Sequence, residues 1–208
     1  MKLLMLRHCP TEGNLLKKYI GRTDEPLCDE GREMARRIGV YDQVECVFTS
    51  PYKRAIETAE ICFPNARKII IDGFREYDFG DFDGLSFTDL ADNPVYREWV
   101  EGNCEGGCPN GDSKESSMER ANRAFRILVN DLATTYEDKV LIIVAHNGVI
   151  MSVFSSYVRD SYDMDYFDWS VHNGEGYIAD VNVGPDGLPE IWNAEKIVDL
   201  SVLDEYFG

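Results

Sequence analysis

The sequence lacks long hydrophobic runs and is short of basic residues. No segment of its 208 residues approaches the roughly 20 apolar residues that a membrane-spanning helix needs. The apolar start, residues 1–6, ends at a charged pair and has no signal-peptide cleavage site. Lys and Arg number 21 against 38 Asp and Glu, so the net charge is −17, and this field repels nucleic acids and anionic membranes. We therefore expect a cytoplasmic protein without nucleic-acid or membrane partners, whose anionic ligand is a small molecule; a homodimer stays open.

Metal-binding spacings are also missing. Six cysteines are present, and Cys104 and Cys108 flank a glycine-rich loop. A zinc site would need two further ligands at matching spacing, and none is near. We predict no metal and no cofactor, and a cytoplasmic setting disfavours a disulfide between these two cysteines.

Hydrophobic patterning predicts one α/β domain over residues 1–208. Apolar strands that alternate with helices indicate a three-layer α/β/α fold with a mostly parallel central sheet. Residues 73–112 are rich in Asp, Gly and aromatics and show no sustained period, so we expect them to form a cap excursion over the active site. The predicted strands are residues 2–6, 44–48, 68–71, 139–145, 176–183 and 188–193, the last two joined by a turn at 184–187; the predicted helices are 31–39, 52–62, 118–132 and 148–158.

Three of the predicted strands end in residues suited to phosphate chemistry. Arg7 and His8 end the first strand, Ser50 follows the second with Arg54 one turn into its helix, and His146 follows the fourth. In a parallel sheet these ends share one edge, where ligands bind. A lone histidine or arginine in such a place is more often structural, so it is their joint occurrence that predicts a site.

Each of these residue types has a chemical reason to be there. A guanidinium matches phosphate oxygens with a rigid fork of donors. Neutral His8 can attack phosphorus and hold the phosphoryl group covalently. Protonated His146 would stabilise charge on the equatorial oxygens. The leaving alkoxide needs a proton donor, and Glu76, after the third strand, is the best-placed carboxylic acid.

At this point the sequence resembles a known family. Arg7-His8-Cys9-Pro10-Thr11-Glu12-Gly13-Asn14 is similar to the Arg-His-Gly-x-Thr-x-x-Asn signature of the histidine phosphatase, or phosphoglycerate mutase-like, superfamily. The resemblance covers residues 3–183 in the right order. Further blocks are residues 21–27, the Ser-Pro-x-x-Arg-Ala-x-x-Thr-Ala match at 50–59, Glu76 with Gly80 and Gly84, residues 110–113, and Val-Ala-His-Asn-Gly at 144–148.

The resemblance implies a phosphatase of small phosphomonoesters. By it His8 is the phosphohistidine nucleophile, Arg7, Arg54 and His146 bind phosphate, and Glu76 is the proton donor and later the base. Asn14 adds a phosphate contact, and Arg22 is a candidate for substrate contact. The family mechanism needs no metal.

Three positions depart from the family pattern. Cys9 replaces a glycine, which would strain the backbone if its φ were positive. A thiol beside positive groups can have a lowered pKa, but a free cysteine more often behaves as a small hydrophobic side chain, and we favour that reading. Asn147 replaces the glycine after the second histidine, and we expect its amide to reach the phosphate. Asp112 is one methylene shorter than the usual glutamate. The third histidine, His172, precedes Asn173-Gly174 in a predicted turn, and we assign it a structural or exposed role.

Alternatives remain within and beyond enzymes. A cofactor-dependent phosphoglycerate mutase shares the pocket, but residues 77–113 contain only Arg97 as a second phosphate anchor. A cysteine-dependent His-Cys-x5-Arg loop fails because Leu15 stands where the arginine is required. A non-catalytic phosphate-binding module would be expected to lack the nucleophile or the acid, and both are present.

Overall fold

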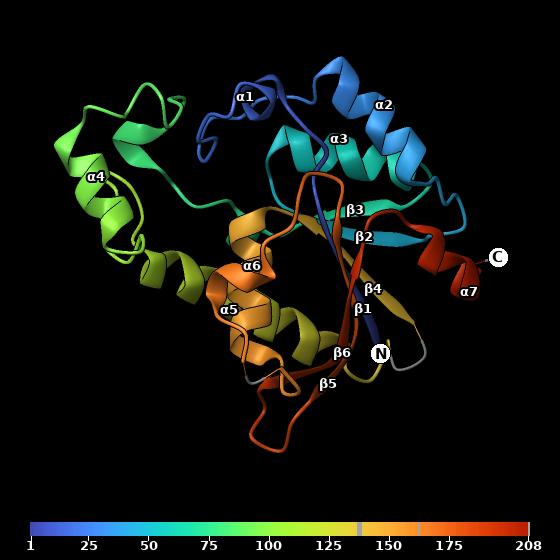
Figure 1. Ribbon diagram of the computed structural model, residues 1–208. Helices are drawn as coiled ribbons and strands as arrows, with labels where there is room; N and C mark the ends of the chain where they lie inside the picture. Colours follow the sequence, from blue (N-terminus) through green and yellow to red (C-terminus); the bar gives the residue numbers. More distant parts are fainter. Residues whose placement is uncertain (137–138, 162, 208) are drawn as a thin grey trace.

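The computed structural model describes residues 1–136, 139–161 and 163–207 (Figure 1). Residues 137, 138, 162 and 208, which the predicted domain includes, lie outside the described residues. The strands are β1 (Lys2–Arg7), β2 (Cys46–Thr49), β3 (Arg67–Ile70), β4 (Val140–Ala145), β5 (Gly176–Val183) and β6 (Pro189–Ile197); the α-helices are α1 (Glu12–Leu15), α2 (Asp29–Ile38), α3 (Lys53–Cys62), α4 (Pro94–Glu101), α5 (Lys114–Leu132), α6 (Asn147–Tyr157) and α7 (Asp204–Phe207). Short 3-10 helices span Asp72–Phe74, Gly80–Phe82, Tyr166–Trp169 and Ser201–Leu203.

The six strands form one sheet in the order β3-β2-β4-β1-β5-β6. β3, β2, β4 and β1 pair in parallel, whereas β5 is antiparallel to both β1 and β6. The sheet is therefore mostly parallel, as predicted. The β5–β6 hairpin closes through the predicted turn, where the Gly187 amide donates to the carbonyl of Gly184 at 3.0 Å.

Alternating side chains of β1 divide the core into two halves. Leu3 and Met5 belong to a cluster with residues of α5 and α6, whereas Leu4 and Leu6 join a cluster with residues of α2 and α3. Successive strand residues point to opposite faces of a sheet, so a fully apolar strand must be covered on both. Figure 1 shows α5 and α6 on one face and α2 and α3 on the other. This confirms the predicted three-layer α/β/α arrangement.

The strand register brings the three chemically loaded strand ends together. Arg7 of β1 pairs with Ala145 of β4, and Thr49 of β2 pairs with Val144 of β4. Because these strands are parallel neighbours, the residues that follow them emerge at one edge of the sheet. The loops that carry the predicted site residues are therefore adjacent in space.

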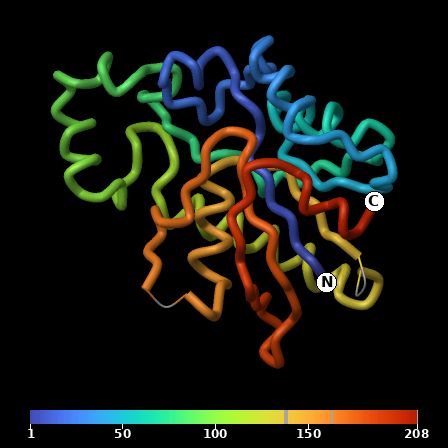
Figure 2. Tube along the Cα trace, turned by 45° about the vertical axis from the view of Figure 1, so that its right-hand side comes forward, coloured from blue at the N-terminus to red at the C-terminus, as the bar shows by residue number. Residues whose placement is uncertain are grey.

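The excursion after β3 packs around its own small apolar cluster. Tyr77, Phe82, Leu90, Trp99 and Cys108 are buried in it. The segment also contains a helix, α4, that the sequence reading missed because its apolar period is short. Both views show this green segment beside the blue N-terminal loop at the same end of the molecule (Figures 1 and 2).

Backbone contacts attach this segment to the loop after α1. The amide of Tyr19 donates to the carbonyl of Leu85 at 2.9 Å, and the amide of Gly84 donates to the carbonyl of Tyr19 at 2.7 Å. The start of α4 has a sequence signal that could have been used: Asn93 caps the helix and Pro94 occupies its first turn. Among the described residues, no helix has the length and apolarity to cross a membrane.

Helix α2 touches the loop that follows β1 at a glycine. A Cβ at Gly31 would lie 2.0 Å from the carbonyl oxygen of Pro10. The same oxygen accepts a hydrogen bond from the amide of Cys28 at 3.2 Å. Only glycine allows this close approach, which holds the loop after β1 against α2.

We expect Gly31→Ala to lower the free energy of unfolding by about 1–3 kcal/mol, because the added methyl group must displace the Pro10 backbone. Gly106→Ala is the matched control, since a Cβ there meets nothing within 4 Å. Urea denaturation of both variants measures the difference. Equal stability of the two variants would contradict the close packing.

Candidate active site

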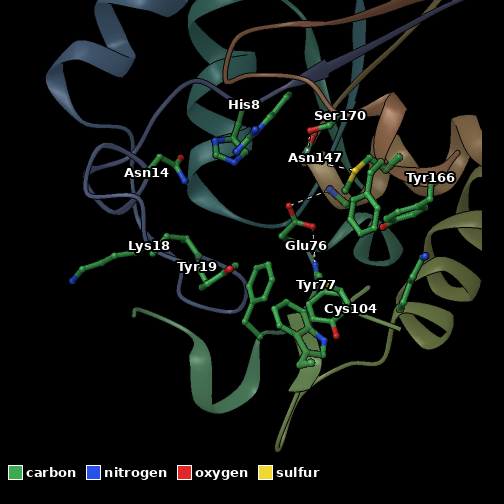
Figure 3. Close-up of a pocket in the computed structure, with 18 residues that line it drawn as sticks. His8, Asn14, Lys18, Tyr19, Glu76, Tyr77, Cys104, Asn147, Tyr166 and Ser170 are labelled. Carbon is green, nitrogen blue, oxygen red and sulfur yellow. Dashed lines mark hydrogen bonds between the residues drawn. The ribbon is translucent and has the colours of Figure 1, made fainter. Parts of the chain in front are cut away.

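A cavity of about 410 Å³ opens at the carboxyl ends of β1 and β4. Figure 3 shows His8 and Asn14 at one end of it and Glu76 near its middle. The remaining lining extends into the cap and along α6. The lining residues are Arg7, His8, Asn14, Lys18, Tyr19, Ile20, Glu76, Tyr77, Phe79, Trp99, Cys104, Lys114, Asn147, Gly148, Met151, Tyr166, Phe167 and Ser170.

His8 is buried, with 3% of its surface exposed, and its tautomer follows from its partner. Its Nδ1 lies 2.7 Å from the carbonyl oxygen of Cys9. A carbonyl oxygen only accepts, so Nδ1 donates and the Nε2 lone pair is free in the neutral ring. Burial and the positive charges of Arg54 and Arg7 lower the pKa of His8 well below its usual value. The ring is therefore neutral and can act as a nucleophile.

His146 lies beside His8, with ring centroids 5.1 Å apart. Its Nε2 is 2.6 Å from the hydroxyl of Ser50, and its Nδ1 is buried with no hydrogen-bond partner among the described residues. Burial, Arg54 and the neighbouring His8 lower the pKa of His146 well below its usual value. These groups therefore favour the neutral ring, whereas the predicted protonated state is that of the transition state, with phosphate bound. The sequence could show neither the burial nor the closeness of two guanidinium groups.

Two arginines provide the positive charge around the histidines. Arg7 lines the cavity and donates from Nη1 to the carbonyl of Val171 at 2.6 Å. Arg54 is fully buried behind the lining, 4.6 Å from the centroid of the Tyr52 ring. The Nε atoms of both arginines are buried and have no hydrogen-bond partner among the described residues. The carbonyls of Ile20, Gly21 and Thr23 accept the other Arg54 hydrogen bonds, at 3.3, 2.9 and 2.8 Å.

The side chain of Asn14 is oriented by Asn173, for which the sequence predicted no role. Its Oδ1 accepts from the Thr11 amide and from Nδ2 of Asn173, both at 3.2 Å. The Asn173 amide nitrogen also donates to the carbonyl of His8 at 3.0 Å. Because Oδ1 is used twice, Nδ2 is the atom of Asn14 left for a ligand in the cavity.

Glu76 is held at the start of α6. Its Oε1 accepts from the amide of Tyr77 at 2.8 Å, and its Oε2 accepts from the amide of Gly148 at 3.4 Å. A Cβ at position 148 would lie 2.4 Å from Oε1, so only glycine leaves room for this carboxyl group. The structure thus places a carboxylic acid in the same cavity as His8.

The whole arrangement suits transfer of a phosphoryl group. Neutral His8, the guanidinium of Arg7 and the carboxyl group of Glu76 line one cavity. His146 and Arg54 lie outside the described lining, beside His8. No cluster of three or more metal-ligating side chains occurs in the part of the chain that the structure describes. The positive charge at this site is supplied by side chains of the chain itself.

Comparison with known proteins agrees with the site. The sequence matches the histidine phosphatase superfamily (branch 1) over residues 3–184. The chain belongs to this superfamily. It is 30% identical to the uncharacterized phosphatase PhoE of Bacillus subtilis (strain 168) over 156 residues. The aligned region covers 73% of this chain and 74% of that protein.

Solved structures place this histidine phosphatase in the same fold. A putative alpha-ribazole-5'-P phosphatase from Escherichia coli superposes with a TM-score of 0.75 at 20% identity, over 96% of this chain and 98% of that one. A phosphoserine phosphatase from Entamoeba histolytica, in complex with 3-phosphoglyceric acid, has a TM-score of 0.67 and 27% identity, over 91% and 94% of the two chains.

Two predicted substrate-binding residues of this histidine phosphatase are engaged elsewhere. Arg22 is half exposed, lies 3.7 Å from a carboxylate oxygen of Asp78, and is absent from the described lining of the cavity. Asn147 lines the cavity, but its Oδ1 accepts from the Val171 amide at 2.9 Å and its Nδ2 donates to Ser170 at 3.1 Å. Its carboxamide therefore holds the loop before β5, which also carries the carbonyl that binds Arg7.

Cys9 behaves as a small buried side chain, the more common of its two expected behaviours. Its φ is not among the positive values of the described non-glycine residues, so the backbone strain does not arise. Burial raises the pKa of its thiol to about 12, so the alternative of a lowered pKa is wrong. The side chain packs into the apolar cluster on the α2 and α3 face. Its amide donates to the hydroxyl of Thr58 at 3.0 Å.

The remaining candidates have structural roles. Arg97 donates to the carbonyl of Ala91 at 2.6 Å and pairs with Asp92 at 2.9 Å, so it is turned away from the cavity. Asp112 accepts from the Asp78 amide at 3.1 Å and pairs with Arg120 at 2.9 Å. Cys104 and Cys108 are free thiols, and His172 is exposed as expected.

Sequence reasoning missed several residues that shape the cavity. Lys18, Tyr19 and Lys114 line it from outside the expected cap, and Asn173 orients Asn14. The Asn-Gly pair at 173–174 signals a turn, but nothing in the sequence indicates that this turn lies against the loop after β1. These contacts join residues more than 150 positions apart.

The lowered pKa values of His8 and His146 predict a specific loss of stability in acid. Below a pH of about 6.5 the unfolded chain binds protons on these histidines and the folded chain does not, so stability is lost as the pH falls. Each histidine contributes a slope of up to about 1.4 kcal/mol per pH unit. We expect His8→Asn and His146→Asn each to weaken the pH dependence of the free energy of unfolding between pH 7.5 and 5.

His172→Asn is the matched control for this measurement, because that side chain is exposed. Chemical denaturation at a series of pH values gives the slopes. Identical slopes in all three variants and the unmodified protein would show that the two buried histidines are not held neutral.

Proposed function

We propose that this protein hydrolyses small-molecule phosphomonoesters through a phosphohistidine intermediate on His8. The observation that carries the proposal is the hydrogen bond from Nδ1 of His8 to the Cys9 carbonyl, 2.7 Å long, in a ring whose pKa is lowered. Together they leave a free Nε2 lone pair in the same cavity as Arg7 and Glu76.

The reaction has two steps. Nε2 of His8 attacks phosphorus, the ester P–O bond breaks, and the leaving oxygen takes a proton from the Glu76 carboxylic acid. Glu76, now a carboxylate, then takes a proton from water, whose oxygen attacks phosphorus. The P–N bond breaks, and inorganic phosphate leaves with His8 neutral again.

Charge stabilisation comes from groups with unused donors. Nε of Arg7 and Nε of Arg54 are buried without partners among the described residues, and Nδ2 of Asn14 is the free end of its amide. A bound phosphate dianion next to His146 favours the protonated imidazole and opposes the burial that lowers its pKa. With these groups in place the reaction is metal-independent.

We assign Asn173 and Asn147 as positioning residues. Asn173 fixes the orientation of Asn14 and holds the carbonyl of His8. Asn147 fixes the Val171 peptide, whose carbonyl accepts from Arg7. Both act through a phosphate-binding residue and not on the phosphate itself.

Hydrolysis is favoured over mutase chemistry by the wall of the cavity. A mutase binds a bisphosphorylated intermediate and therefore needs a second phosphate site. Arg97, the one arginine of residues 77–113, is exposed and paired with Asp92. The described lining contains two lysines, Lys18 and Lys114, but Arg7 is its one guanidinium, so it offers no second guanidinium for another phosphate dianion. A non-catalytic module is disfavoured because His8 and Glu76 lie in the same cavity.

The wider setting of the enzyme also forms part of the proposal. Residues 73–112 act as the cap of a single domain, since they pack around their own cluster beside the cavity. A cytoplasmic location is supported by the six cysteines, all of which are free thiols.

The decisive experiment is phosphate release by His8→Ala. We expect at least about a thousandfold loss of kcat/KM for any phosphomonoester that the unmodified enzyme hydrolyses, because the nucleophile is gone. Cys9→Ser is the matched control: the thiol is protonated and packed away from the cavity, so we expect most of the turnover to remain. After rapid quenching, labelled phosphate that leaves the protein in acid identifies a phosphohistidine and not a phosphocysteine. Acid-stable phosphoproteins are the controls.

The same assay separates the alternatives. Interconversion of 3- and 2-phosphoglycerate with slow phosphate release would identify a mutase. Phosphate binding without turnover would identify the non-catalytic module. Loss of activity in a chelator would contradict the metal-independent mechanism.

The role of Asn173 gives an independent prediction. Asn173→Ala leaves Oδ1 of Asn14 with the Thr11 amide as its one remaining partner. We expect KM to rise about threefold to tenfold with a smaller change in kcat, as about 1 kcal/mol of hydrogen bonding is lost. Asn130→Ala is the control, since that amide donates to the Gly187 carbonyl at 3.1 Å, far from the site. Equal KM and kcat in Asn173→Ala and Asn130→Ala would show that Asn173 has no positioning role.

A further inference from the structure

The cavity is much larger than a phosphate group, and its lining changes character away from His8. Figure 3 shows His8 and Asn14 at one end, with Tyr19 and Tyr166 on different sides of Glu76. Beyond Glu76 the lining is largely aromatic and apolar. This part of the cavity faces the leaving group, because Glu76 protonates the leaving oxygen.

One side of this region is a cap wall formed by Tyr19, Tyr77, Phe79 and Trp99. The ring centroid of Phe79 lies 4.9 Å from those of Tyr19 and Tyr77. Trp99 follows at 6.5 Å from Phe79. From behind, Tyr96 holds the wall through a hydrogen bond between its hydroxyl and that of Tyr19, 2.8 Å long. The rings are therefore fixed before a ligand binds, which lowers the entropy cost of binding.

The other side is a core wall formed by Met151, Tyr166 and Phe167. The rings of Tyr166 and Phe167 lie 5.1 Å apart. A thioether and aromatic faces are surfaces on which a flat ring packs well. The cap wall and the core wall together offer aromatic contact from two different parts of the fold.

Lys114 adds one positive charge beside the core wall. Its ammonium lies 4.7 Å from the Tyr166 centroid and 5.2 Å from the Phe167 centroid. Among the described residues it has no salt bridge, although the protein has 38 acidic residues. Two rings hold the ammonium at the cavity and leave it free to bind an anion.

Lys18 is the other lysine of the lining, and it differs in orientation. Figure 3 shows its amino group pointing away from Glu76. No aromatic ring holds its ammonium in the part of the chain that the structure describes. Lys114 is therefore the better-placed anion ligand.

We propose that the substrate is a phosphomonoester of an alcohol with a flat, ring-containing group that carries its own negative charge. The ring packs between the cap wall and the core wall, and its anionic substituent pairs with Lys114. This inference rests on the proposed hydrolysis at His8. It disfavours compact esters such as phosphoserine or phosphoglycerate, which would leave both walls unfilled.

Three synthetic esters test the substrate class: ethyl phosphate, 2-phenylethyl phosphate, and 2-(4-carboxyphenyl)ethyl phosphate. Their leaving alcohols have similar acidity, so differences in kcat/KM report contacts and not intrinsic reactivity. We expect at least about a tenfold gain from the ring, because a phenyl group leaves water. The carboxylate should add about threefold to fivefold through Lys114.

Matched variants assign these gains to residues. Phe79→Leu should reduce the ratio of kcat/KM for the phenyl ester to that for the ethyl ester about threefold to tenfold. Phe87→Leu is its control, since Phe87 is a cap phenylalanine that is 55% exposed and outside the described lining. Phe167→Leu is a second test. Phe167 belongs to the core wall and is 42% exposed, so its replacement leaves the apolar cluster of the cap unchanged.

Lys114→Met should abolish the advantage of the carboxylated ester over the uncharged phenyl ester. Lys139→Met is the control, because that ammonium also lies over a ring, 5.3 Å from the Tyr136 centroid, but outside the described cavity lining. If Lys18→Met and not Lys114→Met removes the advantage, the assignment of the anion site is wrong.

Binding to His8→Ala, measured by calorimetry, separates this inference from the proposed function. Equal kcat/KM for the ethyl and phenyl esters in a His8-dependent reaction would overturn the inference and leave hydrolysis standing. If no ester is hydrolysed but His8→Ala binds the carboxylated ester more tightly than ethyl phosphate, the proposed function fails and the binding site stands. Equal binding of all three esters would overturn the substrate class.

Discussion

The parallel pairing of β4 between β1 and β2 is the constraint on which the rest of the site depends. Arg7 lies opposite Ala145, and Val144 lies opposite Thr49. The next residue of each strand therefore emerges at the same edge, and this explains why the rings of His8 and His146 lie 5.1 Å apart. The hydrogen bond between His146 and Ser50, 2.6 Å long, is a second contact that follows from the same register. A shift of one residue in either pairing would separate all three side chains.

The site also shows how a very acidic protein can prepare a place for an anion. The guanidinium of Arg54 is fully buried, and three backbone carbonyls accept its hydrogen bonds. These carbonyls compensate the guanidinium without adding negative charge, so the positive field remains for the ligand. Burial and this field together lower the pKa of His8, and the Cys9 carbonyl selects the tautomer with a free Nε2. Charge placement and nucleophile activation are thus two effects of one buried cluster.

The histidine pair and the aromatic cap wall belong to different parts of the fold. His8 and His146 directly follow β1 and β4, so the sheet fixes their positions. Three rings of the cap wall, those of Tyr77, Phe79 and Trp99, stand on a segment with its own apolar cluster, which is attached through the Tyr19 backbone to the loop after α1. A segment packed in this way can change its aromatic residues without disturbing the strand ends.

The sequence by itself determined the fold class and pointed to the candidate residues that the structure brings to one edge of the sheet. Apolar runs such as 139–145 and the residues that follow them are local features, and parallel pairing brings the strand ends together whatever the details of packing. Only the tertiary structure decided the lowered pKa of His146, the burial of Cys9 and the hydrogen-bond partners of Asn147 and Asn173. A pKa depends on burial and on charges from distant segments, and the Asn173 bond to Asn14 joins residues 159 positions apart. The position of Lys114 at the cavity is also decided by the tertiary structure, because it depends on how α5 packs against the 3-10 helix Tyr166–Trp169.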